Sequence, residues 1–166
     1  MKATTWLILC CGIALRLTAW SQRSSLWLDE VALALNVNGR SLWELLAVPL
    51  DYGQAAPRGF LLLQWCITNT VGRSDLAFRL LPCIAGVASL FLFRRVALRV
   101  LSATGAAVAL LYFAFGFWFI FFSADAKPYG LDLTLSLLML ELSFDFRESS
   151  YDAAKRFPLA AAGCFS

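Results

Sequence analysis

The stretch A-T-G-A-A-V-A-L-L-Y-F-A-F-G-F-W-F-I-F-F, Ala103 to Phe122, contains no charged residue. A helix needs about 20 largely apolar residues to cross the core of a lipid bilayer. The second half of the stretch is rich in aromatic residues, which concentrate where the membrane meets water. It is therefore the clearest predicted transmembrane helix of the chain and indicates an integral membrane protein.

The composition agrees with this interpretation. The chain has 166 residues, of which 60% are hydrophobic and 15% charged, whereas soluble domains average about 45–50% apolar and about 25% charged residues. The net charge of +3 is small and dispersed, so we expect a lipid bilayer and no nucleic acid as partner. We expect one transmembrane domain over residues 1–166, the N-terminal fragment of a larger protein, because the apolar run from Phe157 has no end in the sequence.

The chain contains no histidine, and its five cysteines lack the C-x-x-C spacing of metal or redox sites. Histidine is the commonest general base and metal ligand, and cysteines in apolar runs behave as small buried hydrophobic residues. Any chemistry must therefore use carboxylates, lysine, arginine or tyrosine.

A second predicted transmembrane helix runs from Ala3 to about Trp20. Arg16 interrupts it near enough to its end for the charge to extend to the membrane surface. Lys2 before a short apolar core is also typical of a cleaved signal peptide. The apolar stretch continues to Trp20, however, which favours an uncleaved anchor.

The segment from Ser21 to Gly59 is polar and aromatic, with short amphipathic helical patterns broken at Asn38-Gly39 and Pro49. Such patterns predict helices that lie on the membrane surface. Four more segments are apolar: Phe60 to Val71, Leu80 to Phe93, Tyr129 to about Phe144, and the run from Phe157. We therefore expect an all-α, polytopic transmembrane helix bundle with amphipathic external helices in its first loop.

Positive charges predict the orientation, because cytoplasmic loops carry the excess of lysine and arginine. They form three clusters: Lys2; Arg94, Arg95 and Arg99; and Arg147, Lys155 and Arg156. If all three clusters face the cytoplasm, Phe60 to Val71 cannot be a complete crossing, and a helix of that length would rise only about 18 Å. Asp29 and Asp125 would then emerge together on the outer side. A complete crossing would instead place them on opposite faces.

Two adjacent carboxylates, Asp29 and Glu30, end the motif L-W-L-D-E just after the first predicted span. Neighbouring acids can divide the work between a general base and a group that orients a substrate or holds a metal. The pair would equally suit a solvated cap at the start of a helix.

The stretch S-A-D-A-K-P-Y-G-L-D-L interrupts the apolar sequence a second time. Its candidate residues are Asp125, Lys127, Tyr129 and Asp132. Pro128 fits the first turn of a helix, which places Asp132 about one turn inside the next span, where an ionisable group suggests a function. The alternative is that Asp125 caps the helix while Lys127 and Tyr129 anchor it at the interface.

Arg58 and Arg79 border the same predicted surface. A planar guanidinium matches the oxygen pair of a phosphate. Either arginine could also extend from a helix end to the membrane surface, and Arg79 is the better candidate for a phosphate if its helix starts outside.

Five motifs, in their order along the chain, resemble those of a known family. They are W-L-D-E, A-A-P-R-G-F-L-L-L-Q-W, G-R-S-D-L-A-F-R-L-L-P, R-R-V-A-L and S-A-D-A-K-P-Y-G-L-D. The chain is similar to the N-terminal part of the C-type membrane glycosyltransferases (GT-C) related to protein O-mannosyltransferases and aminoarabinose transferases. The resemblance implies transfer of a sugar from a polyprenyl-phosphate donor to an acceptor. It also implies a multi-pass protein of the bacterial inner (plasma) membrane whose active face lies outside the cytoplasm.

The resemblance assigns roles to the motifs. Asp29 and Glu30 match the family's acidic pair in the first external loop, where an acid helps to activate the acceptor. The D-A-K-P-Y stretch matches the acid, basic residue and tyrosine that open a later span. Lys127 and Arg79 would stabilise the phosphate as it leaves, and Glu30 or Asp125 would be the candidates to hold a divalent metal ion.

The sequence departs from the family before Pro57 and in lacking the family's later spans, and it leaves two other functions open. Ala55 and Ala56 precede Pro57, where aminoarabinose transferases carry an acid and a lysine. The positive charge would therefore come from Lys127, Arg79 or Arg58. The alternatives are a lipid-phosphate binding or translocating membrane protein without catalysis, and an inactive truncated remnant.

Overall fold

The computed structural model describes residues 2–22 and 25–163, with side chains for residues 3–22 and 25–148. The side chains of Lys2, Lys155 and Arg156, which helped to predict the orientation, lie outside the described residues. Cys164 lies outside them as well.

The described residues form nine helices and no strand, which confirms the all-α prediction for this part of the chain. The helices are α1 (Lys2–Gln22), α2 (Leu28–Gly39), α3 (Leu42–Ala47), α4 (Arg58–Thr70), α5 (Asp75–Phe78), α6 (Leu80–Val100), α7 (Ala103–Phe115), α8 (Phe117–Phe122) and α9 (Tyr129–Gly163). The last helix does not end near Phe144, as the sequence predicted, but continues to Gly163.

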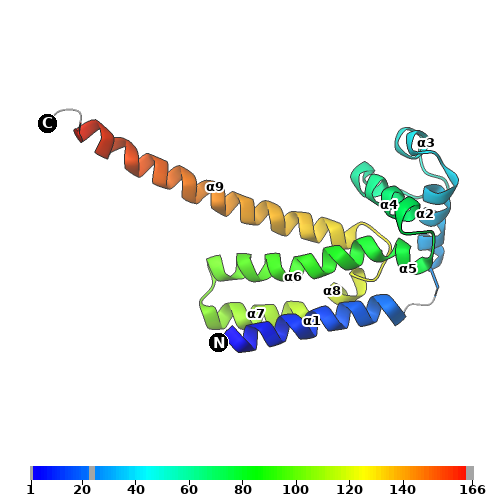
Figure 1. Cartoon of the computed structure of the whole chain (residues 1–166), viewed down its shortest axis with the longest axis horizontal. Coiled ribbons are helices and arrows are strands. Elements are labelled where there is room, and N and C mark those ends of the chain that lie inside the picture. The colour runs from blue at the N-terminus through cyan, green and yellow to red at the C-terminus, as the bar shows by residue number, and fades with distance from the viewer. Residues whose placement is uncertain (1, 23–24, 164–166) are drawn as a thin grey trace.

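Four helices form the body of the molecule, and four shorter helices gather at one of its ends (Figure 1). In the body, α6 packs against α1, α7 and α9. At the end, α4 packs against α2, α3 and α5 instead of lying along the body. Every segment that the sequence predicted to be chemically important therefore lies at or near this end.

Two of the described helices are long and apolar enough to cross a membrane, over Ala3–Gln22 and Leu80–Val100. The first lies near the N-terminus, where a signal sequence would have the same character. The apolar helix Ala103–Phe115 is shorter than a crossing requires.

The predicted single helix from Ala103 to Phe122 is wrong, because the chain breaks at Gly116. Gly116 has a ψ of 123° and separates α7 from α8. A Cβ at this position would lie only 2.8 Å from the ring of Phe119 and 2.9 Å from the backbone oxygen of Tyr112. A side chain at position 116 would overlap both groups, so this close approach requires glycine.

The position predicted for the Arg16 side chain, extended to the membrane surface, is also wrong. The side chain is fully buried and donates to the backbone oxygens of Gly12 at 3.1 Å, Ala114 at 3.2 Å and Phe113 at 3.3 Å. The physical reason is the break at Gly116, since the last carbonyls of a helix have no partner within it. Arg16 supplies donors to two of these carbonyls.

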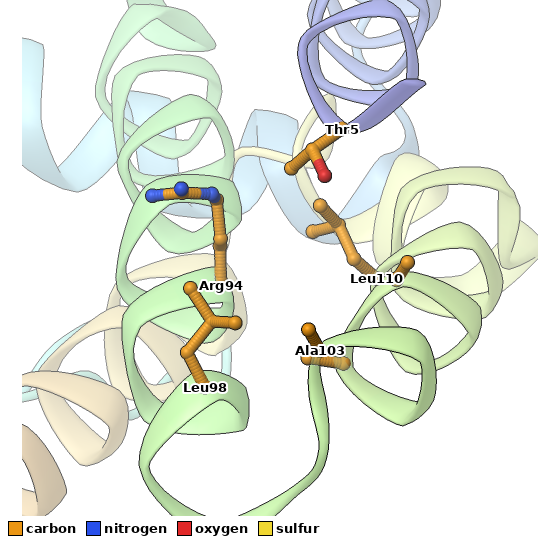
Figure 2. A pocket seen from close by; sticks show the side chains of 7 residues that line it. Thr5, Arg94, Leu98, Ala103 and Leu110 are labelled. Atoms are coloured by element: carbon orange, nitrogen blue, oxygen red, sulfur yellow. The ribbon is translucent and has the colours of Figure 1, made fainter. Parts of the chain in front are cut away.

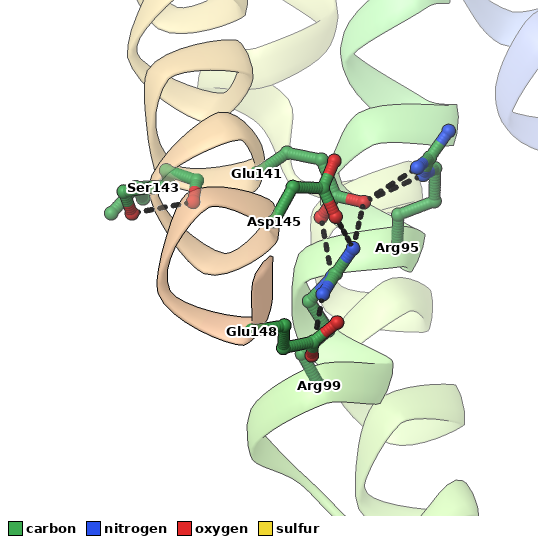
Figure 3. Close-up of polar contacts among 7 residues, drawn as sticks. Arg95, Arg99, Glu141, Ser143, Asp145 and Glu148 are labelled. Atoms are coloured by element: carbon green, nitrogen blue, oxygen red, sulfur yellow. Dashed lines mark hydrogen bonds and ion pairs between the residues drawn. The ribbon is translucent and has the colours of Figure 1, made fainter. Parts of the chain in front are cut away.

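At the end of the body opposite to the short helices, arginines of α6 bind carboxylates of α9 (Figure 3). Arg95 lies 2.8 Å from Glu141, and Arg99 lies 3.1 Å from Glu141 and 2.8 Å from Glu148. Arg99 also pairs with Asp145. These two arginines, expected only to orient the chain, therefore join α6 to α9.

Gly86 of α6 gives a test of how closely the helices pack. A Cβ added there would lie 2.3 Å from the Cβ of Ser123, which begins the loop before α9. We expect Gly86→Ala to destabilise the fold by about 1–3 kcal/mol, because the loop must move away. Gly59→Ala in α4, where a Cβ meets nothing within 4 Å, is the matched control. Thermal unfolding in detergent measures both, and equal melting temperatures would refute the predicted overlap.

Candidate functional site

A buried ion pair joins two residues that the sequence singled out, Glu30 of α2 and Arg79 at the start of α6. The Arg79 Nε donates to Glu30 Oε1 at 3.0 Å and Nη2 donates to Oε2 at 2.6 Å. Glu30 is 1% exposed and Arg79 is 0% exposed. This two-point geometry is the strongest arrangement for a guanidinium and a carboxylate.

The same carboxylate binds two backbone groups. The N–H of Ala126 donates to Glu30 Oε1 at 2.7 Å, and the N–H of Trp27 donates to Oε2 at 2.8 Å. The contact with Trp27 lies at the first turn of α2, where a glutamate three residues on caps the helix start. Arg79 also donates to the backbone oxygen of Ser25 at 2.6 Å. One buried carboxylate therefore holds the L-W-L-D-E and S-A-D-A-K-P motifs together.

These contacts determine the ionisation of Glu30. Burial acts to raise the pKa of the carboxyl, but the hydrogen bonds from Arg79 and from the N–H groups of Ala126 and Trp27 outweigh it, and the pKa lies below its usual value. The group is charged and its oxygens are occupied. It is consequently poorly suited to transfer protons or bind a metal, the roles expected from the sequence, and Arg79 is similarly occupied away from a substrate phosphate.

The chain neighbours of this junction are Asp29, directly before Glu30, and Lys127, directly after Ala126. Asp29 is exposed and lines a cleft of about 350 Å³, here named the Asp29 cleft. Its other lining residues are Leu28, Val31, Ala32, Leu35, Tyr52 and Gln54. Lys127 Nζ donates to Gln54 Oε1 at 2.7 Å. Gln54 thus lines the same cleft as the acid of one motif and accepts a hydrogen bond from the lysine of the other.

The loop that carries Tyr52 and Gln54 is fixed by contacts with the end of α2. Asn36, which is buried, accepts the N–H of Asp51 at 2.8 Å and donates to the backbone oxygen of Asp51 at 3.3 Å. Arg40 forms an ion pair with the Asp51 carboxylate at 2.7 Å. Tyr52 has a φ of 60°, which turns the chain back toward the cleft.

Sequence reasoning missed Tyr52 and Gln54. The segment was noticed only for the alanines that precede Pro57. A left-handed tyrosine before a glycine, and a lone glutamine within a loop, have no periodic pattern that would have distinguished them.

A second hollow, here named the Arg58 groove, adjoins the Asp29 cleft. It has a volume of about 360 Å³ and contains Arg58, the first residue of α4, and Gln54, which lines both hollows. The rest of its lining is mainly apolar and comes from α3 and the segment after it, with Leu61 of α4. Arg58 is therefore an exposed cation within reach of the same surface region.

The remaining predicted residues lie around this region without lining either hollow. Asp125 is half-buried, and its backbone oxygen accepts the N–H of Lys127 at 2.7 Å. The exposed ring of Tyr129 packs against that of Phe122, with centroids 5.1 Å apart. Asp132 is exposed in the first turn of α9.

A divalent metal ion does not fit these residues. No three Cys, Asp or Glu side chains cluster as a metal site would require within the described part of the chain. Glu30 already accepts from four donors.

The described residues form a helical chain with two membrane-length helices and a cleft lined by Asp29 and by Gln54, which binds Lys127. Comparison with known proteins finds no family model, no curated protein and no solved structure that matches the chain.

Proposed function

We propose that the chain is the membrane part of a glycosyltransferase that moves a sugar from a polyprenyl-phosphate donor to an acceptor outside the cytoplasm. The observation that carries the proposal is the 2.7 Å hydrogen bond from Ala126 to Glu30. Asp29 comes directly before Glu30 in the chain, and Lys127 comes directly after Ala126. This bond therefore brings a carboxylate that lines the cleft near an ammonium that binds Gln54 of the same cleft. Transfer from a phosphate carrier requires both kinds of group.

The two groups would share the work of transfer. The acceptor oxygen or nitrogen attacks the anomeric carbon, the bond from that carbon to the phosphate oxygen breaks, and polyprenyl phosphate leaves with the bonding electrons. Asp29 takes the proton from the acceptor. Lys127 stabilises the negative charge that develops on the phosphate, and Arg58 offers a second cation at the neighbouring groove.

The arrangement of helices supports a multi-pass bundle with its active face on the outer side. In this topology α1 runs outward, α6 inward, α7 and α8 together outward, and α9 inward. The short helices α2 to α5 lie on the outer surface as the amphipathic first loop, with α4 as an incomplete crossing. The arginines at 94, 95 and 99 then lie at the cytoplasmic end, as the distribution of positive charge requires.

Lipid-phosphate binding without chemistry is the second candidate. It is favoured by the saturation of Glu30, because only Asp29 of the two adjacent acids lines the cleft, and a single acid gives little support for catalysis. This function needs the cations but leaves Asp29 replaceable. The two proposals therefore differ in the consequence of changing Asp29.

Both candidates predict that Lys127 binds the donor phosphate. We expect Lys127→Gln to weaken binding of undecaprenyl phosphate by about tenfold or more, since a charge-assisted hydrogen bond is lost. Lys127→Arg should retain most of the affinity. The measurement is a titration of protein in phosphatidylcholine nanodiscs by microscale thermophoresis.

The control is Arg73→Gln. It makes an equal charge change at an exposed site of the same end that lines neither hollow. Equal affinity of Lys127→Gln and the unmodified chain would refute this site.

A further inference from the structure

A small hollow lies between α1, α6 and α7 (Figure 2). The end of α6 and the start of α7 lie at the end of the body away from the short helices (Figure 1). Its volume is about 160 Å³, several times the share of one water molecule in the liquid. Arg94 of α6 and Thr5 of α1 both line it, together with Leu98, Ala103 and Leu110. Arg94 lies fourteen residues along the chain from the start of α6, a rise of about 21 Å, so this is a separate site.

Arg94 differs from the two arginines that follow it on the same helix. Arg95 and Arg99 are paired with carboxylates of α9. Among the side chains that the structure describes, no carboxylate pairs with Arg94, and its Nε is buried without a hydrogen-bond partner. A buried donor without an acceptor is costly. The geometry therefore favours an acceptor that comes from outside the chain.

The start of α7 adds positive potential to the same hollow. Ala103, its first residue, lines the hollow, and the cap Ser102 accepts from the N–H of Gly105 at 3.2 Å. The first N–H groups of a helix lack partners within it and form the positive end of its dipole. An arginine and a helix start, placed together, suit a phosphate group.

The apolar residues of the hollow decide what carries the phosphate. Leucine and alanine side chains from α6 and α7 make up most of its wall, and these would contact an acyl chain but not a soluble anion. Basic pockets between membrane helices on the cytoplasmic side are typical sites for anionic lipid head groups.

We propose that this hollow binds the phosphate of an anionic lipid from the cytoplasmic leaflet, with Arg94 as its main ligand. The inference requires α1 and α6 to cross the membrane, and it is independent of the sugar-transfer proposal. A lipid bound there would contact α1, α6 and α7 together.

The test is binding of short-chain phosphatidylglycerol to the purified full chain in a neutral detergent, measured by native mass spectrometry. We expect Arg94→Gln to weaken binding by about tenfold or more. Ala107→Phe, which fills the hollow and leaves the arginine in place, should weaken it similarly. Arg147→Gln, an equal charge change at an exposed position of α9, should change it by less than about twofold.

Three results would overturn the proposal. The first is undiminished phosphatidylglycerol binding by Arg94→Gln or Ala107→Phe. The second is an equal loss in Arg147→Gln, which would indicate attraction to overall charge. The third is displacement of the lipid by inorganic phosphate at an equal concentration, which would indicate a site for a soluble anion.

Discussion

Replacement of Arg79 by glutamine should lower the free energy of unfolding by about 3–5 kcal/mol, because it leaves an ionised carboxylate buried without its partner. Glu30 is 1% exposed and receives two hydrogen bonds from this guanidinium. Domains are stable by only about 5–15 kcal/mol in total, so the variant should lose much of its folded population. Chemical unfolding in detergent, followed by tryptophan fluorescence, measures the change.

A double-mutant cycle separates the pair from its surroundings. Glu30→Gln should be similarly destabilising, whereas the double variant Glu30→Gln with Arg79→Gln should lose less than the sum of the two, since no unpaired charge is left buried. Arg58→Gln, at an exposed position, should change stability by less than about 0.5 kcal/mol. Additive losses in the cycle would show that the two side chains do not interact.

The pair also determines how stability depends on pH. The pKa of Glu30 is below its usual value in the folded chain, so its contribution is fully present above the unfolded-state pKa of about 4.3. It is lost as pH falls through the lower folded-state pKa. Glu30→Gln should therefore show a smaller loss of stability than the unmodified chain when both are taken below about pH 4.

The helical period of α2 separates the two acids of the L-W-L-D-E motif. Glu30, Leu33, Ala34 and Val37 are all buried, and their spacing is that of one helix face. A charged residue in phase with three apolar ones points toward the core and therefore needs a partner. That signal was present in the sequence, and it distinguishes the inward Glu30 from the outward Asp29.

The partner itself could not be predicted. Arg79 lies 49 positions away, and nothing in its local sequence indicates whether it faces a phosphate or a carboxylate. Its position between α5 and α6, with a φ of −92° and a ψ of 1°, is neither helical nor extended. Only the folded arrangement, which brings Glu30 of α2 beside it, decides which group it binds.

The break at Gly116 was hidden for a different reason. Hydropathy measures the polarity of a stretch and not its backbone path. A lone glycine between aromatic residues therefore leaves the mean hydropathy of the stretch high. The compensating donor, Arg16, lies almost 100 positions earlier, at a separation of 98 from Ala114. Its burial becomes understandable only when the unpaired carbonyls at the end of α7 are known.

Substitution of Asp29 by asparagine should reduce sugar transfer by about 100- to 10,000-fold, because a positioned general base is removed. Asp29 is exposed at its cleft and makes no contact that holds the fold together among those described for it, so folding should be unaffected. The assay supplies polyprenyl-phosphate mannose and, separately, polyprenyl-phosphate aminoarabinose to the chain in nanodiscs. Release of polyprenyl phosphate reports transfer to any acceptor, including water.

Binding and turnover must be measured on the same variant, because they separate the two functions proposed for this cleft. If the chain transfers sugar, Asp29→Asn should bind undecaprenyl phosphate within about twofold of the unmodified chain while turnover falls. Asp75→Asn, at the start of α5 and outside the cleft lining, should leave both unchanged.

Undiminished turnover in Asp29→Asn would refute the role of this acid as base. No turnover by the unmodified chain with either donor, together with binding that depends on Lys127, would favour lipid-phosphate binding, because a cation alone can hold a phosphate but cannot take a proton from an acceptor.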